Sequence, residues 1–151
     1  MIGRLADLPS RIERAVAGAD ETALHLAKSD GAWAVPQILA HLRASNDILS
    51  HRIYGLLARS DQPLFLAFDE RRWEEVAGYA QADFRVSLQT FALRRAELVT
   101  MLRHISADDW NRTFRHEERG VLSLLDVVRD IFEHEEEHWA QIEAILTSRN
   151  S

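Results

Sequence analysis

Two histidines stand four residues apart near the C-terminal end of the sequence, in the stretch EHEEEHWAQI. They are His134 and His138, and three consecutive glutamates separate them. Residues at this spacing lie on the same face of an α-helix, one turn apart. Two imidazoles so placed can hold one metal ion, or they can be hydrogen-bonded groups of a protein core. On these two residues alone, both interpretations stay open.

The helix face that carries these histidines is predicted to be the buried one. The same stripe also holds three apolar residues: Ile131, Ile142 and Ile145. Glu136 points almost opposite His134, so the glutamates are expected to form the solvated side of the helix. Two neighbouring buried imidazoles cannot both be charged cheaply, and each ring nitrogen needs a partner. A bound metal would meet both requirements.

Two known metal motifs overlap this stretch. The segment HEEEH, from His134 to His138, satisfies the zinc-protease pattern H-E-x-x-H, in which Glu135 would be the general base. Such proteases need a third ligand further on, and none of the thirteen residues after His138 is a histidine. Glu135-x-x-His138 matches half of the di-iron bundle motif, but the sequence has no second Glu-x-x-His. We therefore expect neither a metalloprotease nor a di-iron protein, and we look upstream for the third ligand.

His41 is the best candidate for that third ligand. It lies in PQILAHLRASND, near the middle of a helix predicted over residues 35–59. His51 is on the same helix but roughly 80° around it from His41. His104 and His116 fall near predicted helix ends or in loops, so both are expected to be exposed. Position therefore favours His41 over the other upstream histidines.

The elements that must position these side chains are predicted to be helices. Helical spacing of apolar residues recurs throughout the sequence, and strand-like alternation is nearly absent. Long helices are expected over residues 2–18, 35–59, 82–104 and from Ser123 to about 147, with a short helix at 69–76. Ser123 followed by Asp126 is a variant of the capping box that starts a helix. We predict an all-α four-helix bundle with a long crossover between the second and third helices, forming a single domain over residues 1–151.

Composition excludes several kinds of protein. The 151 residues include no cysteine, which rules out a disulfide framework and any thiolate-ligated metal. The formal net charge of −6 argues against binding to nucleic acid. No apolar run approaches the roughly 18 residues of a membrane span, and the N-terminal sequence lacks a signal-peptide core. A cytoplasmic protein with no membrane partner is expected.

Two stretches of the chain together resemble a known family. DGAWAVPQILAHL, followed further along by RHEERGVLSLLDVVRDIFEHEEEHWAQI, is similar to the DinB-like superfamily of bacterial four-helix bundles, which includes YfiT-like proteins. The resemblance covers about residues 30–145. The residues that carry it are Trp33, the pair His41-Leu42, Gly120 with Ser123, and His134, His138, Gln141 and Ile142. One departure is Ala34, where serine or threonine is usual; losing such a helix cap typically costs about 1 kcal/mol.

The resemblance implies a site and a chemistry. His41, His134 and His138 would form a three-histidine site for a divalent metal, with water in the open positions. Zinc or nickel is expected, although iron, cobalt or manganese also suits these ligands. An open site of this kind is typical of catalysis, because the metal can lower the pKa of a bound water or thiol. Some members of the superfamily use low-molecular-weight thiols such as bacillithiol or mycothiol. The resemblance thus implies an S-transferase that joins such a thiol to a small electrophilic substrate.

Other interpretations stay open beside the transferase. The protein could be a metal-binding or stress-response bundle with no enzymatic activity, or its histidines could be core groups only. Related bundles often pair, so a homodimer is expected. Asp130 and Gln141, one turn before His134 and near His138, could each accept the second N–H of a ligand imidazole. Equally, Asp130 could be a surface acid and Gln141 could simply cover the core. The pair Arg71-Arg72 could meet an anionic substrate or simply lie at the surface.

Overall fold

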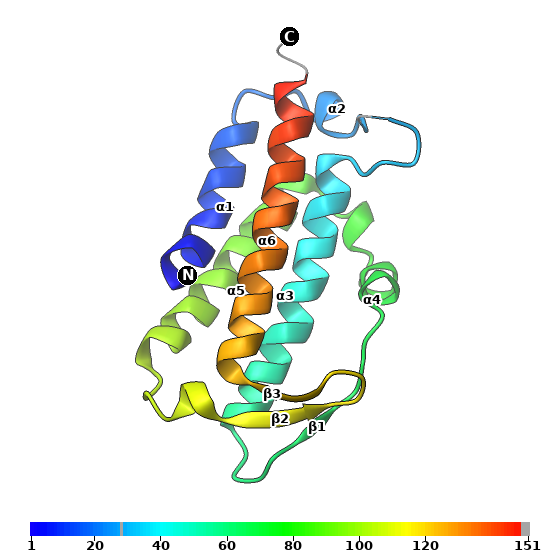
Figure 1. The fold of residues 1–151 in the computed structure, drawn as a ribbon. Helices are drawn as coiled ribbons and strands as arrows, with labels where there is room; N and C mark the ends of the chain where they lie inside the picture. The colour runs from blue at the N-terminus through cyan, green and yellow to red at the C-terminus, as the bar shows by residue number, and fades with distance from the viewer. Residues whose placement is uncertain (28, 149–151) are drawn as a thin grey trace.

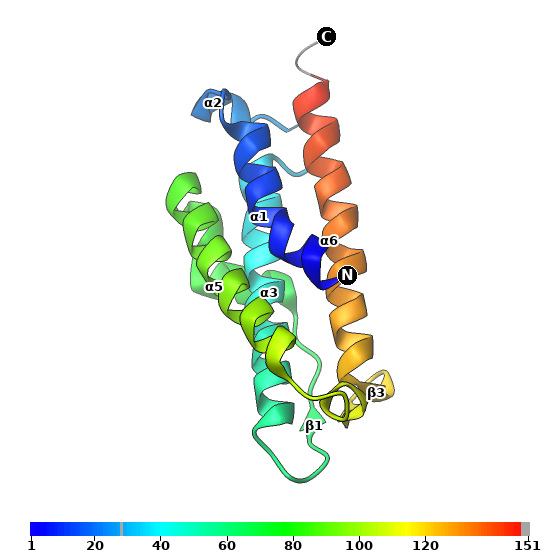
Figure 2. The same cartoon turned by 90° about the vertical axis from the view of Figure 1, so that its left-hand side faces the viewer.

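Four long helices lie side by side and form the body of the protein (Figures 1 and 2). The structure is a computed structural model that describes residues 1–27 and 29–148. The long helices are α1 (Ile2–Val16), α3 (Val35–Leu57), α5 (Phe84–His104) and α6 (Leu124–Thr147). The predicted four-helix bundle is confirmed, and each long helix agrees with its predicted range to within two residues at either end. No helix among the described residues is long and apolar enough to cross a membrane.

The connections between the long helices hold the remaining elements. The shorter elements are α2 (Glu21–Leu24), β1 (Leu64–Phe65), α4 (Glu70–Ala77), η1 (Tyr79–Gln81), η2 (Asp109–Asn111), β2 (Thr113–His116) and β3 (Gly120–Ser123). The crossover from α3 to α5 carries β1, α4 and η1, as the predicted long connection requires. In Figure 1 this crossover runs along the outer side of α3, which places α4 beside that helix.

The expectation that strands are absent was wrong for one small sheet. Strand β2 pairs antiparallel with β3 and parallel with β1, giving the order β1-β2-β3. The sheet lies at the end of the bundle where α6 begins (Figure 1). Gly120 adopts a φ of 76°, which a residue with a side chain rarely takes, at the hairpin's return. The strands are only two or four residues long, too short for the alternation that identifies a strand in a sequence.

The two helices that carry the histidines both begin at defined caps. At the start of α6 the Ser123 hydroxyl accepts from the Asp126 backbone N–H at 3.1 Å, and Asp126 Oδ2 accepts from the Ser123 N–H at 2.9 Å. The predicted capping box is therefore confirmed. At the start of α3, Ala34 has no side-chain acceptor, but Gln37 Oε1 accepts from the Ala34 N–H at 2.8 Å. One of the two hydrogen bonds of a capping box is thus present, although Ala34 lacks the serine or threonine hydroxyl that would make the other.

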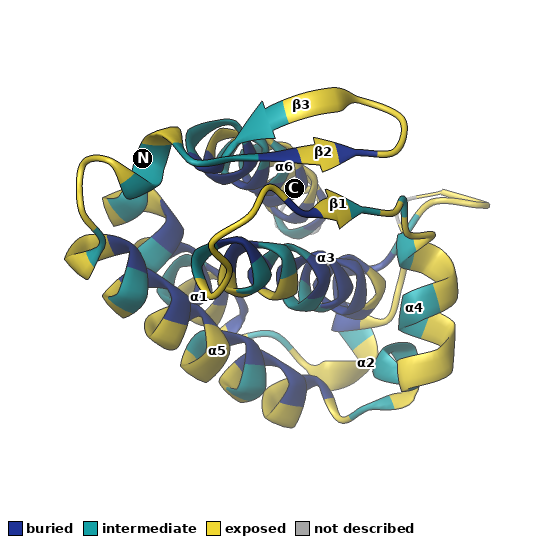
Figure 3. Ribbon diagram, turned by 90° about the horizontal axis from the view of Figure 1, so that it is seen from below, coloured by how far each residue is buried: buried dark blue, intermediate teal, exposed yellow. Residues whose placement is uncertain are grey.

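Two hydrophobic clusters fill the interior, and every long helix contributes to both. One cluster gathers around Phe84, Phe91 and Trp139, and the other around Phe114 and Leu124 near the sheet. Seen from the sheet end, the buried residues line the sides of the helices that face one another (Figure 3). Since α3 and α6 pack directly together, inward side chains of these two helices meet.

Candidate metal centre

The structure brings the three predicted histidines into one cluster between α3 and α6. His41 extends from α3, while His134 and His138 extend from α6. One ring nitrogen from each lies within 4.8 Å of the others. The His134 Nε2 atom is 2.9 Å from Nε2 of His41 and 3.1 Å from Nε2 of His138. Three Nε2 atoms thus point at the same small volume.

Hydrogen bonding around the cluster fits a bound cation. His138 Nδ1 lies 3.0 Å from Gln141 Oε1, and because a carbonyl only accepts, this nitrogen carries the hydrogen and Nε2 keeps its lone pair. His134 Nε2 carries at most one hydrogen, which can point at only one of its two neighbouring nitrogens. The Nδ1 atom of His41 is buried with no hydrogen-bond partner in the described part of the chain. A cation needs no hydrogen at any of the three Nε2 atoms, so the donor set suits one.

Burial keeps all three imidazoles neutral at pH 7. Burial is the largest cause, and together with neighbouring charges (His138 and Arg71 for His41, His138 and His41 for His134) it lowers the pKa of His41 and of His134 from 6.5 to about 4. Burial also lowers the pKa of His138, against opposing effects of its hydrogen bond to Gln141 and of the Glu137 charge. Neutral imidazole is the form that binds metal. The cluster is therefore in the protonation state that a metal site requires.

These lowered pKa values predict that the metal-free protein becomes less stable in mild acid. The unfolded chain protonates its histidines near pH 6.5, whereas folded His41 and His134 stay neutral until about pH 4. Stability present above pH 6.5 should therefore fall as the pH drops toward 4, by about 2 kcal/mol per histidine at pH 4.5. Urea unfolding with a chelator present would measure this loss. Between pH 7 and pH 4.5, His134→Gln should lose less of its free energy of unfolding than the wild type does. Equal losses in the two proteins would contradict the lowered pKa of His134.

An indole and a carboxylate border the cluster. The Trp33 ring stacks on His138, with centroids 6.0 Å apart and planes at 19°, and its centroid is 5.1 Å from that of His41. Glu70 Oε2 lies 3.9 Å from His41 Nε2, and burial raises the Glu70 pKa. Glu70 belongs to the first turn of α4. The sequence predicted a helix there but gave no sign that the crossover would bring this acid to the histidines.

Two cavities adjoin the histidines. One, of about 540 Å³, is bordered by Trp33, Arg71 and His138. The other, of about 260 Å³, is bordered by Glu70 and His134. The cluster can therefore be approached by small molecules from two places.

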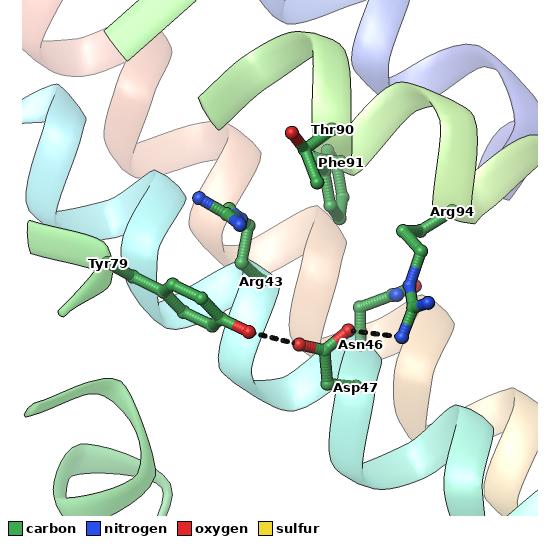
Figure 4. Close-up of a pocket in the computed structure, with 7 residues that line it drawn as sticks. All are labelled: Arg43, Asn46, Asp47, Tyr79, Thr90, Phe91 and Arg94. Atoms are coloured by element: carbon green, nitrogen blue, oxygen red, sulfur yellow. Dashed lines mark hydrogen bonds and ion pairs between the residues drawn. The ribbon is translucent and has the colours of Figure 1, made fainter. Parts of the chain in front are cut away.

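A third cavity, of about 150 Å³, lies between α3 and α5 and contains none of the three histidines (Figure 4). Its polar side chains already have hydrogen-bond or ion-pair partners. The Tyr79 hydroxyl donates to Asp47, and Arg94 lies 3.3 Å from the same carboxylate. Arg43 donates to the Ser87 hydroxyl. We therefore expect the chemistry of the protein at the histidine cluster and not in this cavity.

The two residues considered as partners of the imidazoles, Gln141 and Asp130, have different outcomes. Gln141 accepts from His138 Nδ1, which is one of the two roles left open for it. Asp130 does not contact a histidine, because its carboxylate pairs with Arg119. His116 was expected to be exposed, and this was wrong: it is buried on β2, and its Nδ1 accepts from the Glu118 N–H at 3.2 Å. The missed strand explains that error.

His51 and His104 both lie outside the cluster. Both are exposed, as was expected for His104 from its place near a helix end. They therefore provide clean controls for substitutions at the three clustered histidines.

Glu135 is the largest departure from the sequence expectation. It was assigned to the solvated side of α6, yet it is only 4% exposed and forms an ion pair with Arg95 of α5. Arg95, itself 1% exposed, also donates to Asn46 Oδ1 at 3.0 Å. Burial raises the Glu135 pKa, and the Arg95 charge opposes that rise. A carboxylate engaged in this way cannot be the general base of an H-E-x-x-H protease.

A signal for this ion pair was present in the sequence. Arg95 falls on the apolar stripe of α5 between Phe91 and Leu98, and all three are buried. An arginine on a buried stripe requires an acidic partner. That requirement would have pointed to an inward-facing acid on a neighbouring helix.

Comparison with known proteins agrees with the geometry. The DinB superfamily profile matches residues 4–142. A protein of Oceanobacillus iheyensis named "putative metal-dependent hydrolase" is 26% identical over 149 residues, spanning 99% of this chain and 86% of its own length. YfiT of Bacillus subtilis, which carries the same description, is 24% identical over 139 residues, spanning 91% of this chain and 78% of its own.

The fold also matches a solved structure. YfiT from Bacillus subtilis, described as having an unusual four-helix bundle topology, superposes with a TM-score of 0.86 at 23% identity. The match covers 99% of this chain and 85% of that one. With its profile match and its four-helix bundle, this chain belongs to the DinB superfamily.

Proposed function

We propose that this protein is a metal-dependent enzyme that holds a divalent metal through Nε2 of His41, His134 and His138. The observation that carries the proposal is the convergence of three neutral Nε2 atoms beside two cavities. When bound there, a divalent cation supplies Lewis-acid chemistry and lowers the pKa of a water or thiol that joins it. Zinc or nickel suits three imidazoles, and iron, cobalt or manganese is also compatible with them.

The surrounding residues prepare the histidines for this role. The Gln141 carbonyl fixes the His138 tautomer, so that Nε2 faces the cluster. Burial keeps the rings neutral, and Trp33 covers one side of His138. Glu70 is the acid beside His41, so it is placed to take a proton from a nucleophile bound near the cluster. Glu135 takes no part, since its carboxylate is engaged by Arg95.

Two reaction classes follow from this arrangement. The names of the relatives favour hydrolysis, in which water attacks a small electrophilic substrate. The presence of two separate cavities at the cluster favours a two-substrate reaction, transfer of a low-molecular-weight thiol of the bacillithiol or mycothiol type. The chain has no cysteine, so that thiol would have to come from outside. Cavities that reach the histidines also argue against a closed site that only stores or buffers metal.

A comparison of metal-loaded and metal-free protein tests the proposal. We expect the zinc- or nickel-loaded protein to hydrolyse activated esters or to join thiols to electrophiles faster than the metal-free protein does. If water is the nucleophile, the protein should turn over substrate without added thiol. If a thiol is transferred, the rate should depend on the thiol concentration. Equal rates for loaded and metal-free protein with every nucleophile would favour the non-catalytic metal-binding bundle.

We also propose that residues 1–151 act as one domain. Both hydrophobic clusters draw on α1, α3, α5 and α6, so no part of the bundle has a core of its own. The homodimer stays a prediction, and sedimentation equilibrium would measure it.

A further inference from the structure

The cavity beside His138 has a consistent chemical character. Its walls include the apolar side chains of Trp33, Ile38 and Ile145. Arg71 is the only arginine or lysine among its lining residues, and none of them is an aspartate or a glutamate. A volume of about 540 Å³ is in the range of small-molecule sites, which runs from roughly 300 to 1,000 Å³. The cavity thus offers an apolar surface, one cation and access to the histidine cluster.

Arg71 is held at this cavity without an anionic partner. Its guanidinium carbon lies 5.5 Å from the centroid of the Trp33 ring, a cation–π contact that supports the side chain from one side. Among the described residues, no carboxylate forms an ion pair with it. Glu74 is close enough for the Arg71 charge to lower its pKa, although burial raises that pKa by more. The hydrogen-bond donors of Arg71 therefore remain available to a ligand.

The adjacent arginine behaves differently. Arg72 forms an ion pair with Glu75 at 2.9 Å and lines a separate cavity that contains no clustered histidine. Arg71 and Arg72 thus differ in two respects: whether a carboxylate pairs with the guanidinium, and which cavity the side chain lines. The difference provides a matched control within α4.

We propose that the cavity beside His138 binds a small organic acid, with its carboxylate on Arg71 and its apolar body against Trp33, Ile38 and Ile145. The guanidinium fork matches a carboxylate in two parallel hydrogen bonds. Because Trp33 contacts both Arg71 and the His138 ring, a molecule anchored at Arg71 extends along the indole toward the histidine cluster. The inference rests on the proposed function and gives its substrate a class: an acid with an apolar body.

Binding to the metal-free protein tests this without relying on activity. The probes are phenylacetate, its neutral isostere phenylacetamide, and phenyl phosphate, and NMR titration or calorimetry measures their affinities. We expect phenylacetate to bind about 10-fold more tightly than phenylacetamide, as a charge-assisted hydrogen-bonded pair would give. Arg71→Met should remove that preference, and Arg72→Met should keep it. Tighter binding of phenyl phosphate than of phenylacetate would assign the site to phosphate esters and overturn the carboxylate.

A second measurement separates this inference from the proposed function. Zinc titration should show no loss of affinity for Arg71→Met, because Arg71 is not one of the three clustered residues and its positive charge, which lowers the His41 pKa, opposes a cation at the cluster. Circular dichroism of the variant should match the wild type. Equal binding of acid and amide, or equal losses in Arg71→Met and Arg72→Met, overturns the organic-acid inference while leaving the metal site intact. Failure of the wild type to bind zinc or nickel overturns the proposed function instead.

Discussion

His41→Ala and His138→Ala are each expected to weaken binding of a divalent metal by more than about 100-fold. Loss of a residue that only supports a ligand costs 10–100-fold in affinity, so loss of a ligand should cost more. His138→Ala leaves a single imidazole on α6, and His41→Ala removes the connection to α3. Calorimetry with zinc or nickel, on protein purified without a metal-affinity column, would measure both effects.

Thermal unfolding gives an independent measurement of the same site. A ligand at 100 times its dissociation constant stabilises the folded state by about 2.7 kcal/mol. Metal should therefore raise the Tm of the wild type and should not raise that of either variant. The exposed residues His51 and His104 provide controls, since His51→Ala and His104→Ala should bind metal like the wild type. If His41→Ala binds as tightly as wild type while His51→Ala does not, the third ligand is misassigned.

Glu135→Ala is expected to destabilise the protein by about 3–5 kcal/mol, since it leaves the Arg95 guanidinium buried without its partner. The side chains of Arg95 and Glu135 are only 1% and 5% exposed, so water cannot replace the lost carboxylate. Urea unfolding monitored by circular dichroism would measure the change in free energy. Glu137→Ala, two residues along α6 and exposed, should change stability by less than about 0.5 kcal/mol.

A double substitution distinguishes a buried charge from a general packing defect. Arg95→Met combined with Glu135→Leu removes both charges and should recover most of the stability lost in Glu135→Ala. Metal affinity should stay near the wild-type value in the double variant, because neither residue contacts the histidines. A Glu135→Ala variant as stable as Glu137→Ala would show that the ion pair contributes nothing.

The sequence predicted the long helices because each is long enough for its apolar spacing to be unmistakable. The capping box at Ser123 and Asp126 then set the start of α6, and with it the direction of His134 and His138. The small sheet was not predicted because its strands are too short to show a period. The burial of His116, which lies on one of these strands, was missed for the same reason.

Contacts between distant parts of the chain could not be predicted from the sequence either. Helical spacing shows which face of one helix is buried, but it does not show which helix covers that face. The assignment of Glu135 to solvent failed for this reason, because its partner lies on α5. Glu70 is a similar case, since only the path of the crossover brings it to His41. Residue type, spacing and the family resemblance thus pointed to the three histidines that cluster, whereas the acids around them could be found only from the fold.

Three consecutive residues of α6 engage three different helices. His134 meets His41 of α3, Glu135 pairs with Arg95 of α5, and Glu136 pairs with Arg4 and Arg11 of α1. Successive residues of a helix point about 100° apart, so a rotation of α6 by one residue would break all of these contacts at once. The orientation of α6 is therefore fixed by side-chain contacts that include three salt bridges, one of Glu135 and two of Glu136, none of which needs a bound metal. The histidine site is therefore preformed, and we expect metal binding to leave the backbone almost unchanged.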